Sequence, residues 1–356
     1  MKIGIILHPY NEKNPAGLAR TIFEFTKGML EIDHENEYFI FVKGEKPKPE
    51  LPGENWRFVA LESGLFWLDG LSKYPDIDVC IFNTPALPVF YKPKKSIVLA
   101  LDFAYLILPA ESIKDIFLRK ITRIYHWLSL KKADAIIAIS EATKKDTVNF
   151  FGIPESKIKV VYCGYKKIRL VPEKEVQLPP KYFLYVGIIK ERKNLLTALR
   201  AFALFNKELG DYHFIIAGNG QGEYFNKIKS YLKKEEIEEK VIFLGHSDDR
   251  ELSYIYKRAE ALVFPSLVEG FGYPVLEAMD CGIPVITSKT TSLGEIVNGA
   301  GILVDPMNVD EIKSAMEKLA KNPVFREELV NKGKAHAENF SWHKAAKELS
   351  EVIYKI

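Results

Sequence analysis

Cysteine is scarce in this sequence of 356 residues, and its three cysteines form no recognisable pattern. Cys80, Cys163 and Cys281 include no CxxC pair and cannot all pair with one another. A disulfide scaffold and a structural zinc site are therefore disfavoured, and free thiols fit a reducing compartment. We expect a cytoplasmic protein, with the inner face of the membrane as an alternative location.

Long apolar runs are also missing. Spanning a bilayer takes about 18 or more apolar residues, and the best stretch, SIVLALDFAYLILPA, carries Asp102 in its middle. The first apolar run, in MKIGIILHPYNEKN, is too short for the core of a signal peptide and stops at Pro9. We expect a first strand there and no membrane-spanning segment.

Neither a charge excess nor a common nucleotide fingerprint is present. With 50 Lys and Arg against 47 Asp and Glu, the net charge of +3 gives no general attraction to polyanions, so nucleic acid is not an expected partner. The patterns GxGxxG and GxxxxGK[ST] are both absent, which disfavours a dinucleotide-dependent dehydrogenase and a P-loop NTPase.

Short apolar runs that alternate with helical patterns dominate the sequence. This alternation is typical of parallel βαβ units and predicts an α/β, doubly wound fold. Helices are expected to begin near Ala16, Ser112 and Glu141 in the first half. The expected strands are 2–8, 37–42, 56–61, 78–83, 96–101, 135–140 and 158–162, followed by 181–187, 212–218, 240–245, 261–265, 284–288 and 301–306.

The length and the strand pattern predict two Rossmann-like domains that face a central cleft. The first covers residues 1–165 and would lie on the acceptor side. Residues 166–180, which are charged and rich in proline, are predicted to be a linker. The second domain covers 181–340, and a C-terminal helix in 341–356 can pack back on the first domain.

The stretch VGIIKERKN predicts an anion site. An apolar strand ends at Gly187, and a helix begins near Asn194, a plausible N-cap. Arg192 and Lys193 then lie at a helix entry whose amides favour a phosphate. The alternative is a solvated basic turn.

The stretch EGFGYPVLE combines two carboxylates with two glycines. Pro274 fits the first turn of a helix, Glu277 lies in its first turns, and Gly270 and Gly272 allow close approach of a ligand to the backbone. Carboxylates accept paired hydrogen bonds from sugar or ribose hydroxyls. The alternative is that Glu277 only complements the helix dipole and that the glycines only form a turn.

Three further segments have open interpretations. Gly17 ends a polar loop at a helix entry and can admit a phosphate or sugar. Asp102 follows a strand and can hold an acceptor hydroxyl or cap a turn. The basic, amphipathic segment 112–132, with Trp127, can contact anionic lipid, although burial of one face in its own domain is the favoured interpretation.

Together these stretches resemble the large retaining glycosyltransferase family of GT-B fold often called family 4 (group 1 type). The resemblance covers most of the chain. It rests on the E-x7-E pattern of Glu269 and Glu277 and on the G-x4-RKN pattern that begins at Gly187. ADAIIAISEATKKD and FLGHSDDRELSYIYKRAEALVFPS are supporting similarities.

The resemblance implies transfer of a hexose from a nucleotide-diphospho-sugar to a glycan, lipid-linked sugar or small-molecule hydroxyl. It implies a mannosyltransferase-like enzyme that retains anomeric configuration and requires neither metal nor cofactor. The DID sequence at 76–78, which resembles a metal-holding motif, precedes a strand and is interpreted as a solvated turn. The base, the sugar and the oligomeric state stay open.

By the same resemblance, Arg192, Lys193 and Glu269 would be catalytic. Arg192 and Lys193 would hold the diphosphate, Glu269 would face the donor sugar and Glu277 the ribose. The donor-binding set is completed by Gly17, Gly187, Leu244, Gly245, Gly270, Phe271 and Gly272, with Asp102 on the acceptor side.

This chain departs from the family at Leu101, where many members carry histidine, and at Cys163, where asparagine is usual. Leucine can neither donate that hydrogen bond nor transfer a proton. Two alternative functions stay open, and the absence of this histidine makes the second of them conceivable. One is a nucleotide-sugar epimerase of the same fold, and the other is a catalytically silent protein that binds a sugar nucleotide or glycan.

Overall fold

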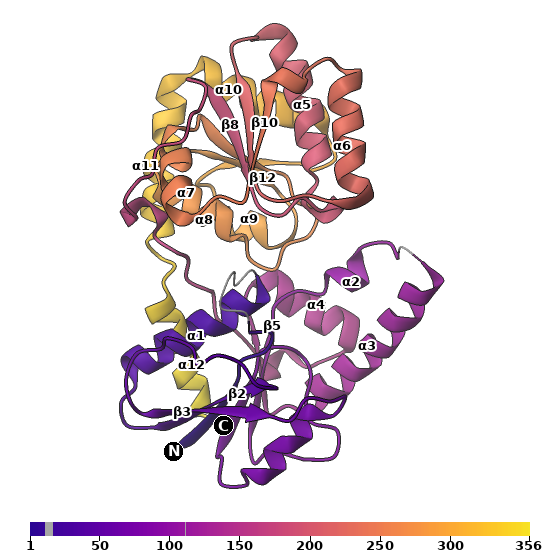
Figure 1. The fold of residues 1–356 in the computed structure, drawn as a ribbon, viewed down its shortest axis with the longest axis vertical. Coiled ribbons are helices and arrows are strands. Elements are labelled where there is room, and N and C mark those ends of the chain that lie inside the picture. Colours follow the sequence, from indigo (N-terminus) through magenta and orange to yellow (C-terminus); the bar gives the residue numbers. More distant parts are fainter. Residues whose placement is uncertain (11–16, 111) are drawn as a thin grey trace. The chain divides into compact units, whose positions relative to one another are not determined.

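The computed structural model describes residues 1–10, 17–110 and 112–356, which form two compact units (Figure 1). Unit 1 contains residues 1–164 and 340–356, and unit 2 contains residues 165–339. Each unit has a parallel sheet of its own, so the predicted α/β class with two Rossmann-like domains is confirmed.

Unit 1 is built on a seven-stranded parallel sheet in the order β3-β2-β1-β4-β5-β6-β7. The strand order reverses direction at β1, which pairs with β2 on one side and with β4 on the other. Every strand predicted for the first half has a counterpart: β1 (Lys2–Ile6), β2 (Glu37–Lys43), β3 (Trp56–Leu61), β4 (Val79–Phe82), β5 (Ser96–Ala100), β6 (Ala135–Ala138) and β7 (Ile158–Val160).

The helices of unit 1 cover this sheet. The predicted start near Ala16 lies outside the described residues, and α1 begins at Leu18. The helical elements are α1 (Leu18–Ile32), η1 (Trp67–Lys73), α2 (Ala104–Ile107), α3 (Ile113–Lys132), α4 (Glu141–Phe151), η2 (Glu155–Lys157) and α12 (Trp342–Ile353). Ser112 and Ser140 cap α3 and α4 by accepting from the backbone amides of Asp115 and Thr143.

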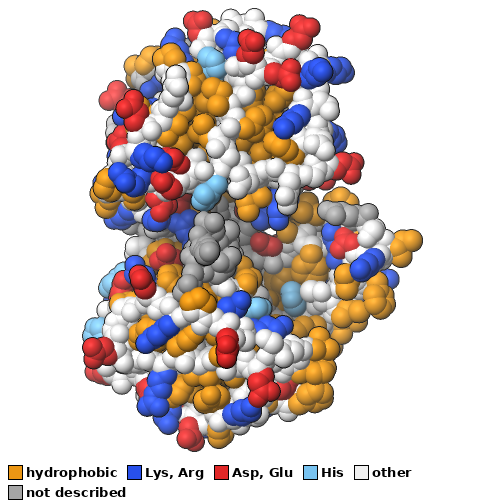
Figure 2. Space-filling view, viewed as in Figure 1, with side chains coloured by type: hydrophobic (Ala, Val, Ile, Leu, Met, Phe, Trp, Pro, Cys, Tyr) orange, Lys and Arg blue, Asp and Glu red, His pale blue; other side chains and the backbone are white. Residues whose placement is uncertain are grey.

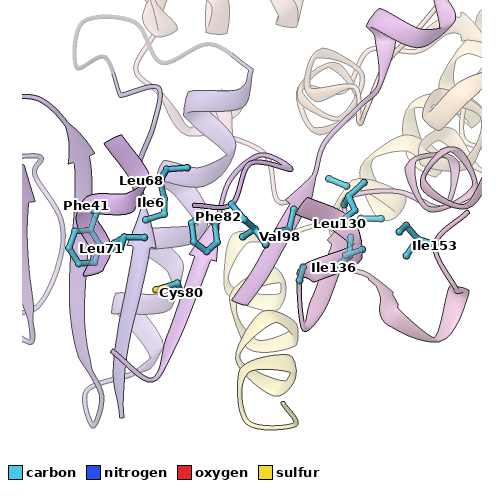
Figure 3. Close-up of a cluster of buried hydrophobic side chains, with 14 of the residues drawn as sticks. Ile6, Phe41, Leu68, Leu71, Cys80, Phe82, Val98, Leu130, Ile136 and Ile153 are labelled. Carbon is cyan, nitrogen blue, oxygen red and sulfur yellow. The ribbon is translucent and has the colours of Figure 1, made fainter. Parts of the chain in front are cut away.

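A hydrophobic core fills one side of the first sheet (Figure 3). Ile6, Phe82 and Val98 project into it from β1, β4 and β5, and Leu68 of η1 packs against them. Leu130, in the last turn of α3, is fully buried in the same cluster. These buried strand residues explain why the sequence shows near-continuous apolar runs.

Unit 2 has a six-stranded parallel sheet in the order β10-β9-β8-β11-β12-β13, and each of the six strands corresponds to one predicted from the sequence. Its strands are β8 (Tyr182–Val186), β9 (His213–Ala217), β10 (Val241–Gly245), β11 (Ala261–Phe264), β12 (Val285–Ser288) and β13 (Ile302–Val304). Its helical elements are η3 (Ile168–Leu170), η4 (Glu191–Lys193), α5 (Leu195–Glu208), α6 (Gly222–Lys234), η5 (Glu238–Lys240), α7 (Asp249–Arg258), α8 (Tyr273–Asp280), α9 (Thr291–Val297), α10 (Val309–Lys321) and α11 (Pro323–Ala337).

The segment 166–180, predicted as a linker, packs as part of unit 2. Ile168 of η3 is buried, and Lys174 forms an ion pair of 2.7 Å with Glu251 at the start of α7. Its charges and prolines suggested a solvated segment, but these contacts tie it to the second domain.

The C-terminal segment belongs to unit 1, where α12 packs along α1. Glycine favours this close approach, because a Cβ on Gly28 would lie 3.1 Å from the Trp342 carbonyl oxygen, a tight contact. The rings of Phe25 and Trp342 meet edge to face at 5.3 Å. The chain therefore returns to its first unit after completing the second.

Helix α3 differs from the favoured expectation, which was that it buries one apolar face in its own domain. Over most of its length the side facing unit 1 is polar, and large apolar side chains such as Ile113, Phe117 and Ile124 are exposed at 87%, 63% and 59%. Amphipathicity alone could not show which face turns inward.

Candidate functional site

The strand order of unit 2 reverses between β8 and β11, and the two predicted motifs follow these strands. Gly187 and η4 come directly after β8, and the loop 265–272 comes directly after β11. In open parallel sheets, ligands bind at the carboxyl ends of the strands where the order reverses. The sequence motifs thus fall at the binding position that the topology defines.

Arg192 and Lys193 converge on the Glu269 carboxylate across these two loops. The Arg192 guanidinium lies 3.7 Å from Glu269, and the Lys193 ammonium forms a close ion pair with it. The Ser266 hydroxyl donates to Glu269 Oε1 at 2.8 Å. The side chain of Glu269 is only 8% exposed, so this cluster is largely shielded from water. An incoming diphosphate would compete with Glu269 for the same two cations.

Further hydrogen bonds fix the positions of the two loops. Arg192 donates from its guanidinium to the Val268 carbonyl at 3.0 Å, and its own carbonyl accepts from the Leu267 amide at 2.8 Å. The Ser266 hydroxyl also lies 2.9 Å from the Arg192 carbonyl. Sequence reasoning missed Ser266, although its place directly after the strand ALVFP was a usable signal.

Asn194 occupies the N-cap position of α5 as predicted, but its side chain does not cap the helix. It adopts the left-handed conformation, with φ 55°, and its side chain makes no capping bond. Its amide instead donates to the carbonyls of Pro265 and Pro306 at 3.0 and 2.6 Å, and Thr197 donates to its Oδ1 at 2.6 Å. Asn194 therefore ties together the loops that follow β8, β11 and β13.

The α5 amides are also less free than expected, because the Leu196 amide donates to the Tyr224 hydroxyl at 3.0 Å. This pairing leaves one fewer helix amide for an anion, so the predicted anion site depends on the side chains of Arg192 and Lys193 as well as on the helix terminus.

Residues of α9 fix the position of the loop 269–272, which precedes α8 and contains Gly270 and Gly272. The Ser292 hydroxyl donates to the carbonyls of Glu269 and Phe271 at 2.9 and 3.3 Å. Gly272 has φ 107°, and a Cβ there would lie 2.5 Å from the Leu293 side chain. Pro274 occupies the first turn of α8 as predicted, and glycine is required at 272. Gly270 and Phe271 are buried between these anchored positions.

Glu277 lies inside α8 and is only 4% exposed. The hydroxyl of Tyr256 in α7 lies 3.4 Å from its Oε2 atom. The first turn of α8 contains no acidic residue, so Glu277 is not placed to complement the helix dipole. A carboxylate has two acceptor oxygens, so Glu277 can accept hydrogen bonds from ligand hydroxyls as well as from the tyrosine hydroxyl.

Three glycines meet at the carboxyl ends of β8, β9 and β10. The Gly187 amide donates to the Ala217 carbonyl at 3.0 Å, and Gly218 and Gly245 form a bridge. A Cβ on Gly218 would lie 1.9 Å from the Gly187 carbonyl oxygen, so only glycine fits there. Sequence reasoning missed Gly218 in AGNGQGE. Leu244 and Gly245 lie half-buried beside it, in β10.

Tyr185 of β8 adds a neutral polar group beneath the cluster. Burial raises the pKa of its phenol well above the usual value, and the nearby Glu269 charge raises this pKa further. Its hydroxyl donates to the Ile188 carbonyl at 3.3 Å. Tyr185 therefore stays protonated and adds no negative charge to the cation site.

The predicted residues of unit 1 lie at the corresponding edge of the first sheet. Gly17, exposed and with φ 53°, precedes α1. Asp102 follows β5, and its carboxylate accepts from the Ala104 amide at 3.1 Å in the turn that leads into α2, whose N-cap position is Phe103. Asp102 lies near Asp146, whose pKa is raised by burial and then by the Asp102 charge. The DID turn at 76–78 lies at the opposite, amino edge, where the Asp78 carboxylate accepts from the Lys2 amide at 2.9 Å.

The two units define a GT-B type of architecture, and solved structures share it along the whole chain. Sucrose-phosphate synthase from Thermosynechococcus elongatus matches with a TM-score of 0.78 at 16% identity, over 99% of this chain and 98% of that one. Alr3699/HepE from Anabaena, in complex with UDP and glucose, matches with a TM-score of 0.75 at 15% identity, over 100% of both chains. At these identities the likeness shows the fold.

Comparison with protein families shows to which family the chain belongs. Residues 15–167 match the family described as Glycosyltransferase Family 4, and residues 167–336 match Glycosyl transferases group 1. The chain belongs to these glycosyltransferases of GT-B fold, as its motifs predicted. The O-antigen chain mannosyltransferase B of Escherichia coli is 31% identical over 223 residues, which are 60% of this chain and 58% of that protein. The chain spans 27% to 62% of the lengths of the curated relatives it matches.

Proposed function

We propose that this protein transfers a hexose from a nucleotide-diphospho-sugar to a hydroxyl acceptor, with retention of anomeric configuration and without a required metal or cofactor. The observation that carries the proposal is the convergence of Arg192 and Lys193 on Glu269 where the strand order of unit 2 reverses. Two cations with one carboxylate leave a net positive site, which suits a diphosphate leaving group.

The comparisons support the donor class. The name of the mannosyltransferase relative says that it transfers mannose, which is a hexose. The HepE structures contain UDP with glucose, or UDP-glucose. Whether this chain uses a uridine, guanosine or adenosine diphosphate sugar depends on contacts at Leu244 and Gly245, where the nucleotide base would lie. The acceptor is a glycan, a lipid-linked sugar or a small molecule.

In the proposed reaction, the bond between the anomeric carbon and the diphosphate oxygen breaks as the acceptor oxygen forms a bond on the same face. The acceptor proton passes to the departing phosphate oxygen. The reaction therefore needs no protein base, and the absence of a histidine at Leu101 does not prevent it. Arg192 and Lys193 stabilise the developing negative charge, which is the largest electrostatic demand of the step. Glu269 then turns toward the sugar hydroxyls.

The test is donor hydrolysis and transfer by Arg192→Ala and Lys193→Ala. Removing one preorganised charge donor typically lowers the rate by about a hundredfold or more, and we expect a loss of that size in each variant. Lys190→Ala is the matched control, because Lys190 is an exposed lysine two positions before Arg192. Near-normal turnover in both site variants would reject the assignment.

Incubation of the wild type with a panel of nucleotide sugars separates the alternatives. A new free nucleotide sugar formed without acceptor would identify an epimerase. Nucleotide binding with no consumption of any donor, across an acceptor panel, would identify a silent binding protein. Transfer to an acceptor with release of nucleoside diphosphate supports the proposal.

A further inference from the structure

Helix α3 is attached to unit 1 mainly through polar groups. The Arg119 guanidinium donates to the carbonyls of Tyr105 and Leu108 at 2.7 and 2.6 Å. The hydroxyls of Tyr125 and Ser129 bond the Leu87 carbonyl and amide at 2.6 and 3.1 Å. Positions 115, 119, 122, 126 and 129, three or four residues apart, form this inward stripe.

The opposite side of α3 is apolar and exposed (Figure 2). Exposed apolar residues also recur every three or four positions and therefore share one side of the helix. The seven that share this side are Ile113 at 87%, Ile116 at 46%, Phe117 at 63%, Ile121 at 49%, Ile124 at 59%, Trp127 at 39% and Leu128 at 42%, and Leu118 next to them is exposed at 51%. We call these seven residues the α3 face. A contiguous exposed apolar surface of this kind marks an interaction site.

The positive charge of α3 indicates which partner binds the α3 face. Residues 113–132 contain six Lys and Arg but a single Asp, a net charge of +5, whereas the whole chain carries +3. Lys120 and Lys131 lie within four residues of Phe117 and Trp127, so positive charge borders the apolar side chains. A second copy would bring the same positive charge to the contact and be repelled.

We propose that the α3 face docks unit 1 on an anionic phospholipid membrane. A helix with Trp, Phe and aliphatic residues on one side and many basic residues lies in the plane of the bilayer interface. Trp127, with the Lys131 ammonium 5.0 Å from its ring centre, presents an aromatic body beside a cation, as interfacial residues do. Among the described residues no helix is long and apolar enough to cross a bilayer, so this contact is peripheral.

Vesicle co-sedimentation without any nucleotide sugar tests the apolar contribution. Vesicles of phosphatidylglycerol and phosphatidylcholine in equal parts should bind the wild type, and Phe117→Ser/Ile121→Ser/Ile124→Ser should lower the partition coefficient by about a hundredfold or more. Met307→Ser/Val324→Ser is the control, because both are exposed apolar residues of unit 2, at 67% and 79%.

A second variant tests the charge contribution. Lys114→Gln/Lys120→Gln/Lys132→Gln should weaken binding by about a hundredfold, whereas Lys227→Gln/Lys233→Gln/Lys234→Gln on α6 removes equal charge and should bind like the wild type. Raising the ionic strength from about 0.1 M to about 1 M, which shortens the Debye length from about 10 to 3 Å, should weaken wild-type binding.

Quenching by brominated lipid chains locates the contact. It should reduce the emission of the wild type more than that of Trp127→Phe. Failure of the wild type to bind anionic vesicles would overturn the proposal, as would control variants that bind as poorly as the α3 variants. A dimer that only the serine variant disrupts would instead assign the face to self-association. Donor hydrolysis, measured separately, reports on the transferase proposal, so the two can fail independently.

Discussion

At the scale of single residues, Glu269 and Glu277 belong to one nine-residue motif but lie in different surroundings. Glu269 faces Arg192 and Lys193 on a neighbouring loop, and Glu277 is buried in α8 beside Tyr256. Their unequal partners argue against a shared acid and base role, since such pairs need carboxylates that act on one reacting group. Divided work along one donor molecule fits this geometry better.

Two isosteric substitutions test this division. Glu277→Gln should weaken donor binding by about tenfold or more with a smaller effect on kcat, because a ribose contact contributes equally before and during reaction. Glu269→Gln should lower kcat by about a hundredfold without weakening nucleoside diphosphate binding, because Arg192 and Lys193 lose a competing anion. Steady-state kinetics and calorimetric titration separate the two effects. Equal losses of affinity and kcat in both variants would contradict the division.

His126 in α3 makes the stability of unit 1 depend on pH. Burial lowers its pKa from 6.5 to about 4, and its Nδ1 atom lies 3.0 Å from the Tyr105 hydroxyl. Below pH 6.5 the unfolded chain takes up a proton that the folded chain does not. Stability should therefore fall by about 3 kcal/mol between pH 6.5 and 4, and be fully present above pH 6.5.

Urea unfolding followed by tryptophan fluorescence measures this effect, because all four tryptophans lie in unit 1. His126→Gln should remove most of the loss, leaving the smaller share of His8, whose pKa is also lowered by burial. His34→Gln changes an exposed histidine and should keep the wild-type slope. An unchanged slope in His126→Gln would contradict the assignment.

At the scale of elements, the strands could be predicted because burial on both faces leaves continuous apolar runs. The helix termini and faces were harder. Asn194 has the residue type of an N-cap, but its left-handed backbone and its bonds to Pro265 and Pro306 arise from loops distant in sequence. The inward polar stripe of α3 depends likewise on Leu87 and Tyr105.

Asn194 should be a strong determinant of unit 2 stability. Asn194→Ala removes the donors to two buried carbonyls and leaves alanine at φ 55°, so we expect a loss of about 2–4 kcal/mol. Asn194→Gly relieves the backbone strain and should recover about 1 kcal/mol of it. Denaturant unfolding followed by far-UV circular dichroism measures both.

Asn298 provides the control for backbone strain alone. It is exposed, ends α9 and has φ 41°, so Asn298→Ala should cost only about 1 kcal/mol. If Asn194→Ala costs no more than Asn298→Ala, the hydrogen bonds of Asn194 contribute nothing measurable.

At the scale of the whole molecule, unit 1 is not one continuous stretch of the chain. It contains residues 1–164 and also residues 340–356, which follow unit 2 in the sequence. Helix α12 buries five apolar residues in unit 1: Ala345, Ala346, Leu349, Val352 and Ile353. The predicted site splits the same way, with Arg192, Lys193 and most of the donor-binding set in unit 2, and with Gly17 and Asp102 in unit 1. Sequence patterns place both motifs on their strands, but which unit receives the last helix depends on the small Gly28 and on the apolar stripe of α1.

Deleting residues 340–356 should therefore destabilise unit 1, although the rest of unit 1 lies far from this segment in the sequence. Unit 2, which directly precedes the segment in the sequence, should keep its stability. Each large apolar side chain removed from burial costs about 1.5–3 kcal/mol, and at least four are lost with this segment: Phe340, Leu349, Val352 and Ile353. This loss consumes much of a typical domain stability of about 5–15 kcal/mol. The fluorescence of Trp56, Trp67 and Trp127 should show a transition at much lower urea, while nucleoside diphosphate affinity stays at the wild-type value. Removing only Lys355 and Ile356 is the control. Loss of nucleotide binding together with an unchanged tryptophan transition would show that α12 supports unit 2 instead.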